Sequence, residues 1–227
     1  MRRSVLFLVA ALGLGACAAV APTPRTAEEH AALAKARDLH WVVESAEGQF
    51  IGSATAFGPG RLVTNAHVVE PWIGLDLRVR QGAQVHPVRF LNLAVRSDVA
   101  LLHVSAPGIP APETGERPKV HDRLLVAGAT RYSTHDGAGV VIPGIAGAHR
   151  AEDYITARLP VLRGFSGGPV VDADGRLVGI TTAALIRRHI DSPEITHTDP
   201  GMTIDHRPAL VIPSALVRAV LREEGFD

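Results

Sequence analysis

The chain has 227 residues, and its basic and acidic side chains balance, so the formal net charge is zero. This length suits one large domain or two small ones, and the balanced charge argues against a nucleic-acid binder with a broad basic face. The single cysteine, Cys17, excludes an intramolecular disulfide, so packing has to stabilise the fold.

The first twenty residues have the features of an export signal. Arg2 and Arg3 form a positive amino-terminal region, and the apolar run that follows is too short to span a bilayer comfortably. The stretch LGAC resembles a bacterial lipobox, in which Cys17 would be lipidated and become the new amino terminus. The alternatives are ordinary cleavage at the small residues 16–18 and an uncleaved membrane anchor. We expect a signal peptide over residues 1–16 and a lipid on Cys17.

Residues 17–39 are expected to join the lipidated terminus to the folded domain. Their first part is rich in Pro and Ala and is typical of an extended tether. Thr26 could cap a short helix, with Glu29 completing a capping box and residues 31–37 continuing the helix. A disordered spacer is the alternative interpretation of the same stretch.

From Trp41 onward the sequence is typical of an all-β protein. Short runs rich in Val, Ile, Leu and Thr alternate with turns rich in Gly, Pro, Asn and Asp. Short strands with turn signals about every 8–12 residues predict a sandwich or a barrel. The Pro- and Gly-rich stretch 105–118 is typical of a linker between two halves. Apolar residues at helical spacing predict a final helix that begins near Ser214 and ends before Gly225.

Three segments place a reactive polar residue beside apolar strand sequence. LVTNAHVVE carries His67, RSDVALLHV carries Asp98 and RGFSGGPVV carries Ser166. A serine becomes a nucleophile only with a base, an acid that orients the base, and donors for the developing oxyanion. Each segment alone also has a structural explanation: a packed histidine, a turn before a strand, or a loop serine.

Together and in this order, the three segments resemble the trypsin-like serine peptidase superfamily, and most closely its bacterial HtrA-type members. The resemblance covers about residues 41–222. It implies an all-β fold of two antiparallel six-stranded β-barrels with a C-terminal helix. The implied protease domain spans residues 40–227, with barrel one at about 40–110, barrel two at about 118–213 and the helix at about 214–224.

The resemblance also implies a mechanism for each residue. Ser166 would attack the peptide carbonyl, while His67 would take its proton and later return it to the leaving amine. Asp98 would hold the imidazole tautomer, and the backbone N–H groups of Gly164 and Ser166 would form the oxyanion hole. In digestive relatives an aspartate precedes the serine and pairs with a freshly cut amino terminus. Phe165 stands there in this chain, so we expect no activation of that kind.

The primary specificity pocket is inferred from the same resemblance. Its expected lining is Pro160, Leu162, Thr182, Ala183, Ala184 and Ala209. No carboxylate falls at its base, where Pro160 should lie, and binding of Arg or Lys would need a negative partner. We therefore expect a small or medium aliphatic side chain in this pocket. HtrA proteins usually add a peptide-binding PDZ domain, which we do not expect after Asp227.

Metal binding and cofactors are not expected. The eleven histidines are scattered, and none shows the spacing of a zinc motif. His189, His197 and His206 fall in a polar stretch, 187–208, that is typical of a solvated loop. The expected partners are polypeptide substrates and, through Cys17, a membrane; nucleic acid is not expected, and the oligomeric state stays open.

The sequence therefore favours an exported serine endopeptidase of the bacterial cell envelope, anchored by its lipid and facing the periplasm, or secreted. Two alternatives stay open. The chain could be a non-catalytic or latent protein of the same fold that captures peptides, or it could act as a chaperone in envelope quality control.

Overall fold

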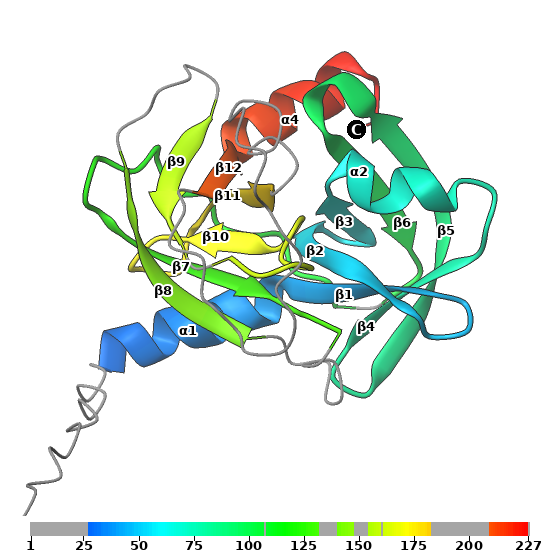
Figure 1. The fold of residues 1–227 in the computed structure, drawn as a ribbon, viewed down its shortest axis with the longest axis horizontal. Coiled ribbons are helices and arrows are strands. Elements are labelled where there is room, and N and C mark those ends of the chain that lie inside the picture. The colour runs from blue at the N-terminus through cyan, green and yellow to red at the C-terminus, as the bar shows by residue number, and fades with distance from the viewer. Residues whose placement is uncertain are drawn as a thin grey trace, which may run out of the picture.

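Figure 1 shows the computed structural model, in which residues 27–106, 108–131, 140–147, 154–159, 161–182 and 209–226 are described. The strands form two closed barrels of six strands each, in the orders β1-β2-β3-β6-β5-β4 and β10-β11-β12-β9-β8-β7. Neighbouring strands pair antiparallel in both barrels, and the chain ends in a helix. The predicted fold class is confirmed.

The first barrel carries its strands in the amino-terminal half of the described chain. They are β1 (His40–Ser45), β2 (Phe50–Gly58), β3 (Arg61–Thr64), β4 (Leu77–Gln81), β5 (Gln84–Ala94) and β6 (Val99–Val104). A short helix, α2 (Ala66–Val69), and a 3₁₀ turn, Glu70–Trp72, follow β3, and a second 3₁₀ turn, Val95–Ser97, separates β5 from β6. These two connections place His67 and Asp98 just beyond paired strands.

The second barrel follows the linker. Its strands are β7 (Arg123–Gly128), β8 (Val140–Ala146), β9 (Ile155–Arg158), β10 (Pro169–Val171), β11 (Leu177–Thr182) and β12 (Ala209–Pro213). Helix α4 (Ser214–Glu223) begins directly after β12. Its buried face, including Val217 and Leu221, packs with Val63 and Leu101 of the first barrel and with Ile180 of the second. The helix therefore ties the two barrels together from one side.

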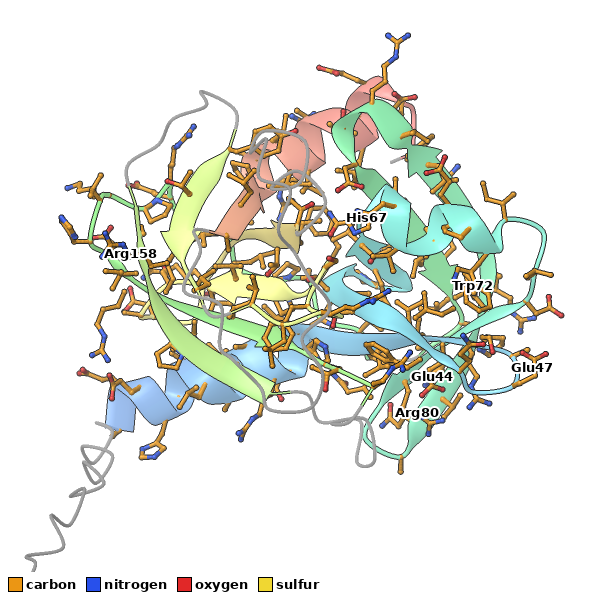
Figure 2. All side chains as sticks on the ribbon, in the orientation of Figure 1. Glu44, Glu47, His67, Trp72, Arg80 and Arg158 are labelled. Atoms are coloured by element: carbon orange, nitrogen blue, oxygen red, sulfur yellow. The ribbon has the colours of Figure 1, made fainter. Side chains whose placement is uncertain are left out.

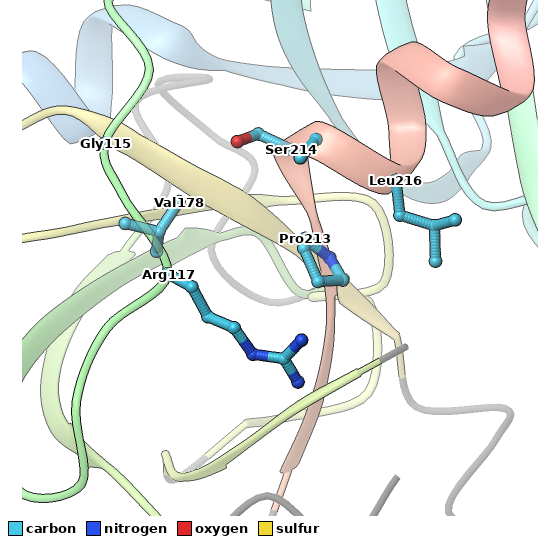
Figure 3. Close-up of a pocket in the computed structure, with 7 residues that line it drawn as sticks. Gly115, Arg117, Val178, Pro213, Ser214 and Leu216 are labelled. Atoms are coloured by element: carbon cyan, nitrogen blue, oxygen red, sulfur yellow. The ribbon is translucent and has the colours of Figure 1, made fainter. Parts of the chain in front are cut away.

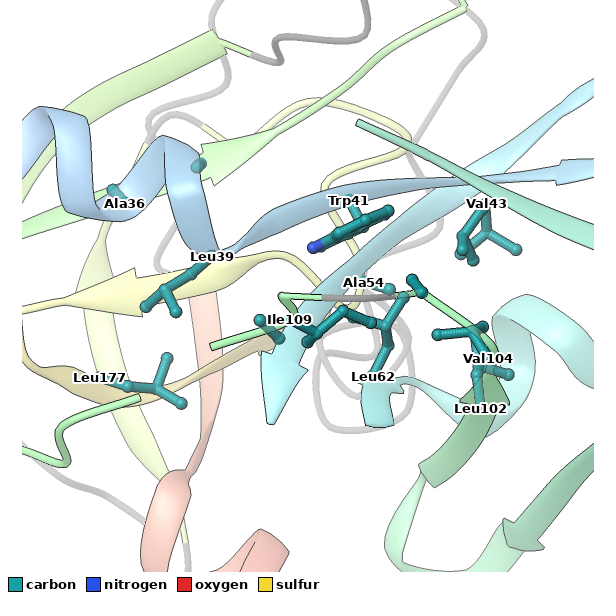
Figure 4. Close-up of a cluster of buried hydrophobic side chains, with 14 of the residues drawn as sticks. Ala36, Leu39, Trp41, Val43, Ala54, Leu62, Leu102, Val104, Ile109 and Leu177 are labelled. Carbon is teal, nitrogen blue, oxygen red and sulfur yellow. The ribbon is translucent and has the colours of Figure 1, made fainter. Parts of the chain in front are cut away.

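A larger apolar cluster joins the barrels elsewhere (Figure 4). It contains Trp41, Leu62 and Leu102 of the first barrel, and Leu177 of the second. Leu62 and Leu102 are fully buried in this cluster. The hydrophobic effect that stabilises each barrel therefore also fixes the position of one barrel against the other.

The segment before the first strand is helical, not a disordered spacer. Helix α1 (Ala27–Leu39) lies along the second barrel, against β7, β8 and β10 (Figure 1). Its buried face consists of Ala32, Leu33, Ala36 and Leu39, all members of the large cluster. The proposed cap, Thr26, lies outside the described residues. The small alanines let the helix backbone approach the sheet closely.

A buried carboxylate lies on the first barrel. Glu44 of β1 is hydrogen-bonded to the guanidinium groups of Arg78 and Arg80, each at 2.8 Å, and Figure 2 shows Glu44 beside Arg80. Burial alone would favour the neutral carboxyl, but the hydrogen bonds and charges of the two arginines prevail and lower the pKa of Glu44. The group therefore stays ionised at neutral pH inside its arginine clamp.

A hollow of about 200 Å³ lies where the linker passes the start of α4 (Figure 3). It is lined by Gly115, Arg117, Val178, Pro213, Ser214, Ala215 and Leu216. None of the predicted triad residues lines it. Among the described residues, no helix is long and apolar enough to cross a membrane.

The close approach of α1 generates a stability prediction. Ala36→Leu should lower the free energy of unfolding by about 1–3 kcal/mol, because three extra carbons would be forced into a fully packed contact. Ala34→Leu, on the exposed face of the same helix, should change it by about 0.5 kcal/mol or less. Urea unfolding of both variants measures the difference, and equal effects would contradict the packing of this face.

Candidate active site

His67 and Asp98 are in direct contact. The imidazole Nδ1 lies 2.9 Å from Asp98 Oδ1 and 3.0 Å from Oδ2. The backbone N–H of His67 also donates to Oδ1, at 3.1 Å. An ionised carboxylate only accepts hydrogen bonds, so Nδ1 carries the proton and Nε2 keeps a free lone pair. This is the tautomer in which a histidine can accept a proton from a hydroxyl.

Asp98 is held by both barrels. The residue ends the turn Val95–Ser97 with a left-handed backbone, φ 54°, and its carbonyl accepts a hydrogen bond from the Asn65 side chain, at 3.1 Å. From the second barrel, the Thr182 hydroxyl donates to Oδ2 at 2.8 Å. The carboxylate therefore has hydrogen-bond partners in both barrels.

Ser166 lies in the second of two consecutive tight turns. In the first, the Leu162 carbonyl accepts from the Phe165 N–H at 3.0 Å, and Gly164, at the third position, has φ +106°. In the second, the Phe165 carbonyl accepts from the Gly168 N–H at 2.8 Å, with φ +84° at Gly167. A positive φ at the third position is typical of a type II turn, which favours glycine there.

These turns leave two donors unused. Within the described part of the chain, neither the Gly164 N–H nor the Ser166 N–H has a hydrogen-bond acceptor. Gly164 itself is enclosed, because a Cβ there would meet the Ala129 carbonyl and the ring of Phe50. Two unpaired N–H groups in a rigid turn beside a serine hydroxyl are the arrangement that an oxyanion hole requires.

The serine segment packs against the strand that leads to His67. A Cβ at Gly167 would strike Thr64, and the Thr64 hydroxyl donates to the Ser53 carbonyl at 2.6 Å. Among the described residues, however, no hydrogen bond joins Ser166 Oγ to His67 Nε2. Such bonds are often long in unliganded enzymes and shorten when substrate binds. The structure therefore brings His67 and Asp98 into contact, and it places Ser166 in the adjoining loop.

Phe165 takes a structural position in place of the aspartate of digestive relatives. Its side chain is fully buried in the core of the second barrel, with Val126 and Val170. A Cβ at Gly128 would overlap the Phe165 ring, so this glycine makes room for it. The turn that carries Ser166 is thus anchored by an apolar side chain.

Four side chains of this site make contacts that the sequence did not predict. They are Asn65 and Thr182, which hold Asp98, and Ser53 and His40, which lie under the turn of Gly164. Asn65 immediately precedes the short helix that carries His67. This position was the one local signal in the sequence that Asn65 belongs to the site. Thr182 was assigned only to the specificity pocket, and nothing in its sequence neighbourhood indicates a contact with Asp98.

The predicted pocket is described only in part. Leu162 is half-buried, Thr182 and Ala209 are buried, and Ala209 pairs with Ala157 of β9. Pro160, Ala183 and Ala184 lie outside the described residues, as do Cys17, His189, His197 and His206. The pocket assignment therefore stays a prediction. In the ranges that the structure describes, no group of three or more metal-binding side chains occurs.

Two closed six-stranded barrels, a histidine paired with an aspartate and a serine in a glycine-rich turn are the features of one class of protein, the trypsin-like peptidases. The model of the trypsin-like peptidase domain matches residues 52–180, more than half of the chain. The chain belongs to this family.

Individual relatives of the chain include proteins named as Do-like and DegP-like proteases. The chain is 27% identical over 165 residues to Protease Do-like 2, chloroplastic, of Arabidopsis thaliana, covering 68% of this chain and 27% of that protein. It is 27% identical over 131 residues to a probable periplasmic serine endoprotease DegP-like of Chlamydia pneumoniae, covering 55% and 26%. The chain spans about a quarter of the length of these curated relatives.

A solved structure shares the fold. The serine endoprotease from Yersinia pestis superposes with a TM-score of 0.68 at 19% sequence identity, over 90% of this chain and 68% of that one. At this identity the likeness shows the fold alone.

The buried histidine beneath the turn generates a pH prediction. Burial lowers the pKa of His40 from 6.5 to about 4. An unfolded chain binds a proton at His40 near pH 6.5, whereas the folded chain keeps it neutral until about pH 4. The free energy of unfolding should therefore fall by about 3 kcal/mol as the pH drops through this window.

The control is His40→Gln, which keeps a donor but does not titrate. Urea unfolding at several pH values should show a shallower loss of stability for this variant between pH 6.5 and 4 than for the parent chain. The lowered pKa of Glu44 affects both proteins equally, because both contain the same arginine clamp, and its contribution cancels in the comparison. Parallel curves would contradict the assignment of the window to His40.

Proposed function

We propose that this chain is a serine endopeptidase that hydrolyses peptide bonds in envelope or secreted proteins. The observation that carries the proposal is the contact of His67 Nδ1 with both oxygens of Asp98, which leaves Nε2 free to accept a proton. The Ser166 turn, with its two unpaired N–H groups, supplies the other parts that acyl transfer needs. The endoprotease names of the relatives support this class of reaction.

The proposed reaction has two halves. Ser166 Oγ forms a bond to the carbonyl carbon of the substrate while its proton passes to His67 Nε2, and the carbonyl oxygen becomes an oxyanion. The intermediate collapses as His67 gives the proton to the leaving amine, and an acyl-enzyme is left. Water then attacks the carbonyl carbon of the acyl-enzyme while its proton passes to His67. The second intermediate collapses as His67 returns the proton to Ser166 Oγ, and the carboxylic acid is released.

Backbone donors would stabilise the oxyanion in both halves. The N–H groups of Gly164 and Ser166 are already oriented by the two turns, so they need no reorganisation when charge develops. One such donor lowers the activation barrier by roughly 3 kcal/mol. Asp98, fixed by Thr182, would stabilise the imidazolium that forms in each half.

The site of action is proposed from the amino-terminal sequence. A signal peptide over residues 1–16 and a lipid on Cys17 would hold the protein in the cell envelope, facing the periplasm; without the lipid it would be secreted. Relatives named as probable periplasmic endoproteases support the same compartment. Polypeptides are the expected substrates.

A second function, peptide capture or chaperone-like binding without hydrolysis, is favoured by one observation. Among the described residues, no hydrogen bond joins Ser166 Oγ to His67. A latent or non-catalytic site would lack this hydrogen bond as well. Suppression of client aggregation by Ser166→Ala protein would support binding of this kind, because that variant cannot cleave.

Covalent labelling tests the catalytic proposal. A fluorophosphonate probe should label the purified chain at Ser166, because phosphonylation needs the same base and oxyanion donors as acylation. Ser166→Ala should lose all labelling, and Ser45→Ala, which removes a buried hydroxyl from β1, should keep it. Mass spectrometry of the labelled peptide identifies the residue. Absence of labelling in the parent chain, or labelling that survives in Ser166→Ala, would contradict the proposal.

A peptide library tests the proposed specificity. Cleavage should follow small or medium aliphatic residues, because no carboxylate is expected at the base of the pocket to pair with Arg or Lys. The measurement is the rate of cleavage of peptides that differ only in the residue before the scissile bond, with Ser166→Ala as the blank. A strict preference for Arg or Lys would show that the pocket assignment is wrong.

A further inference from the structure

A buried hydroxyl lies directly beneath the turn that carries the unpaired donors. Ser53 of β2 is fully buried, and its Oγ contacts three polar groups from three different segments. It lies 2.7 Å from the Gly164 carbonyl oxygen, 3.0 Å from the Ala129 backbone nitrogen and 3.1 Å from His40 Nε2. A hydroxyl has one donor and two acceptor positions, so three partners use all of its hydrogen-bonding capacity.

The protons in this cluster can be assigned from chemistry alone. A carbonyl oxygen only accepts, so the single Ser53 proton is donated to Gly164. The two remaining positions on Oγ accept from the Ala129 N–H and from His40. His40 therefore carries its proton on Nε2, and its Nδ1, which has no partner among the described residues, is unprotonated. Burial, which lowers the pKa of His40, supports this neutral form.

Ser53 contacts both residues of the expected oxyanion hole. Its hydroxyl fixes the Gly164 carbonyl, and the N–H on the same peptide group, that of Phe165, is fixed by Leu162. Its own backbone N–H donates to the Ser166 carbonyl at 3.2 Å. One residue of the first barrel thus holds the backbone from which both unpaired N–H groups of the second barrel project.

We propose that Ser53, oriented by His40, is the positioning residue of the oxyanion hole. It does not touch the substrate; it acts by holding the Gly164–Phe165 peptide group, so that the Gly164 and Ser166 N–H groups point at the same place. This inference rests on the proposed peptidase function. The hydrogen bond from Ser53 is needed because residue 164 is a glycine. Without a Cβ, its backbone has little intrinsic preference for one conformation.

Removal of the Ser53 hydroxyl leaves its three partners without a hydrogen bond. In Ser53→Ala the Gly164 carbonyl, the Ala129 N–H and His40 would all be buried without their hydrogen bond. Buried polar groups in that state tend to rotate toward new partners or water. The Gly164–Phe165 peptide group lies between the two peptide groups that carry the Gly164 and Ser166 N–H groups. Its rotation changes ψ of Gly164 and φ of Phe165, and so it changes the orientation of these two donors relative to each other.

The kinetic test compares Ser53→Ala with the parent chain and with Ser45→Ala. Ser45 is a matched control, because its buried hydroxyl on β1 also makes two hydrogen bonds, with Glu47 and Gln49, away from the turn. Ser53→Ala should lower kcat about 10- to 100-fold with KM within about twofold, because the donor acts mainly in the transition state. Ser45→Ala should keep the parent kcat, and an unchanged kcat in Ser53→Ala would overturn the inference.

Amide hydrogen exchange gives a readout that does not depend on activity. Exchange of the Phe165 N–H should accelerate in Ser53→Ala by at least about tenfold more than exchange of the Val104 N–H, which is bonded to Gly60 in the first barrel. Equal acceleration of both amides would mean a general loss of stability and would overturn the positioning role. If the parent chain neither cleaves nor labels, the peptidase proposal fails, and the exchange result still decides whether Ser53 holds the turn.

A pair of His40 variants tests the orienting histidine. His40→Gln keeps an N–H donor near the position of Nε2, whereas His40→Leu has similar bulk and no donor. His40→Leu should lower kcat at least about fivefold more than His40→Gln. Equal loss in both would show that His40 serves packing only and would remove it from the proposal.

Discussion

The carboxylate of Asp98 is the point on which this site depends, because groups from both barrels meet there. His67 binds it from the first barrel, and the Thr182 hydroxyl binds it from the second. A carboxylate with partners on only one side could rotate, and the imidazole would rotate with it. The relative position of the barrels therefore sets the direction of His67 Nε2. Apolar packing supplies that position: the cluster around Leu62 and Leu177, and the contacts of α4, join the barrels on two sides.

Hydroxyl groups of the first barrel continue this arrangement along the interface. Thr55 of β2 donates to the Gly167 carbonyl at 2.7 Å, and Ser53 donates to the Gly164 carbonyl at the same distance. The Ser166 loop lies between these two donors. Backbone carbonyls of an irregular loop have no sheet partner, so buried side-chain donors are needed to satisfy them. The loop is thus rigid because a neighbouring barrel completes its hydrogen bonds, which is what preorganised donors require.

Much of this architecture could be predicted from the chain. Alternating short strands and turns were enough for the all-β class, and the resemblance carried by the segments of His67, Asp98 and Ser166 indicated two barrels. The helix before β1 was ambiguous, because its alanine-rich face suits either a tether or a close packing contact. The contacts of Thr182, Ser53 and His40 could not be predicted, since each acts through a residue far away in the chain. A hydroxyl on an apolar strand looks the same whether it meets a carboxylate, a carbonyl or solvent.

Phe165 has a consequence for how the site responds to its surroundings. An ion pair with a cut amino terminus would weaken as salt is added and would appear only after cleavage of the chain. A fully buried aromatic ring is indifferent to ionic strength and is in place as soon as the second barrel has folded. The contact by which it anchors the turn of Ser166 is instead hydrophobic, and so it weakens on cooling. This anchor therefore depends on temperature rather than on salt or on cleavage of the chain.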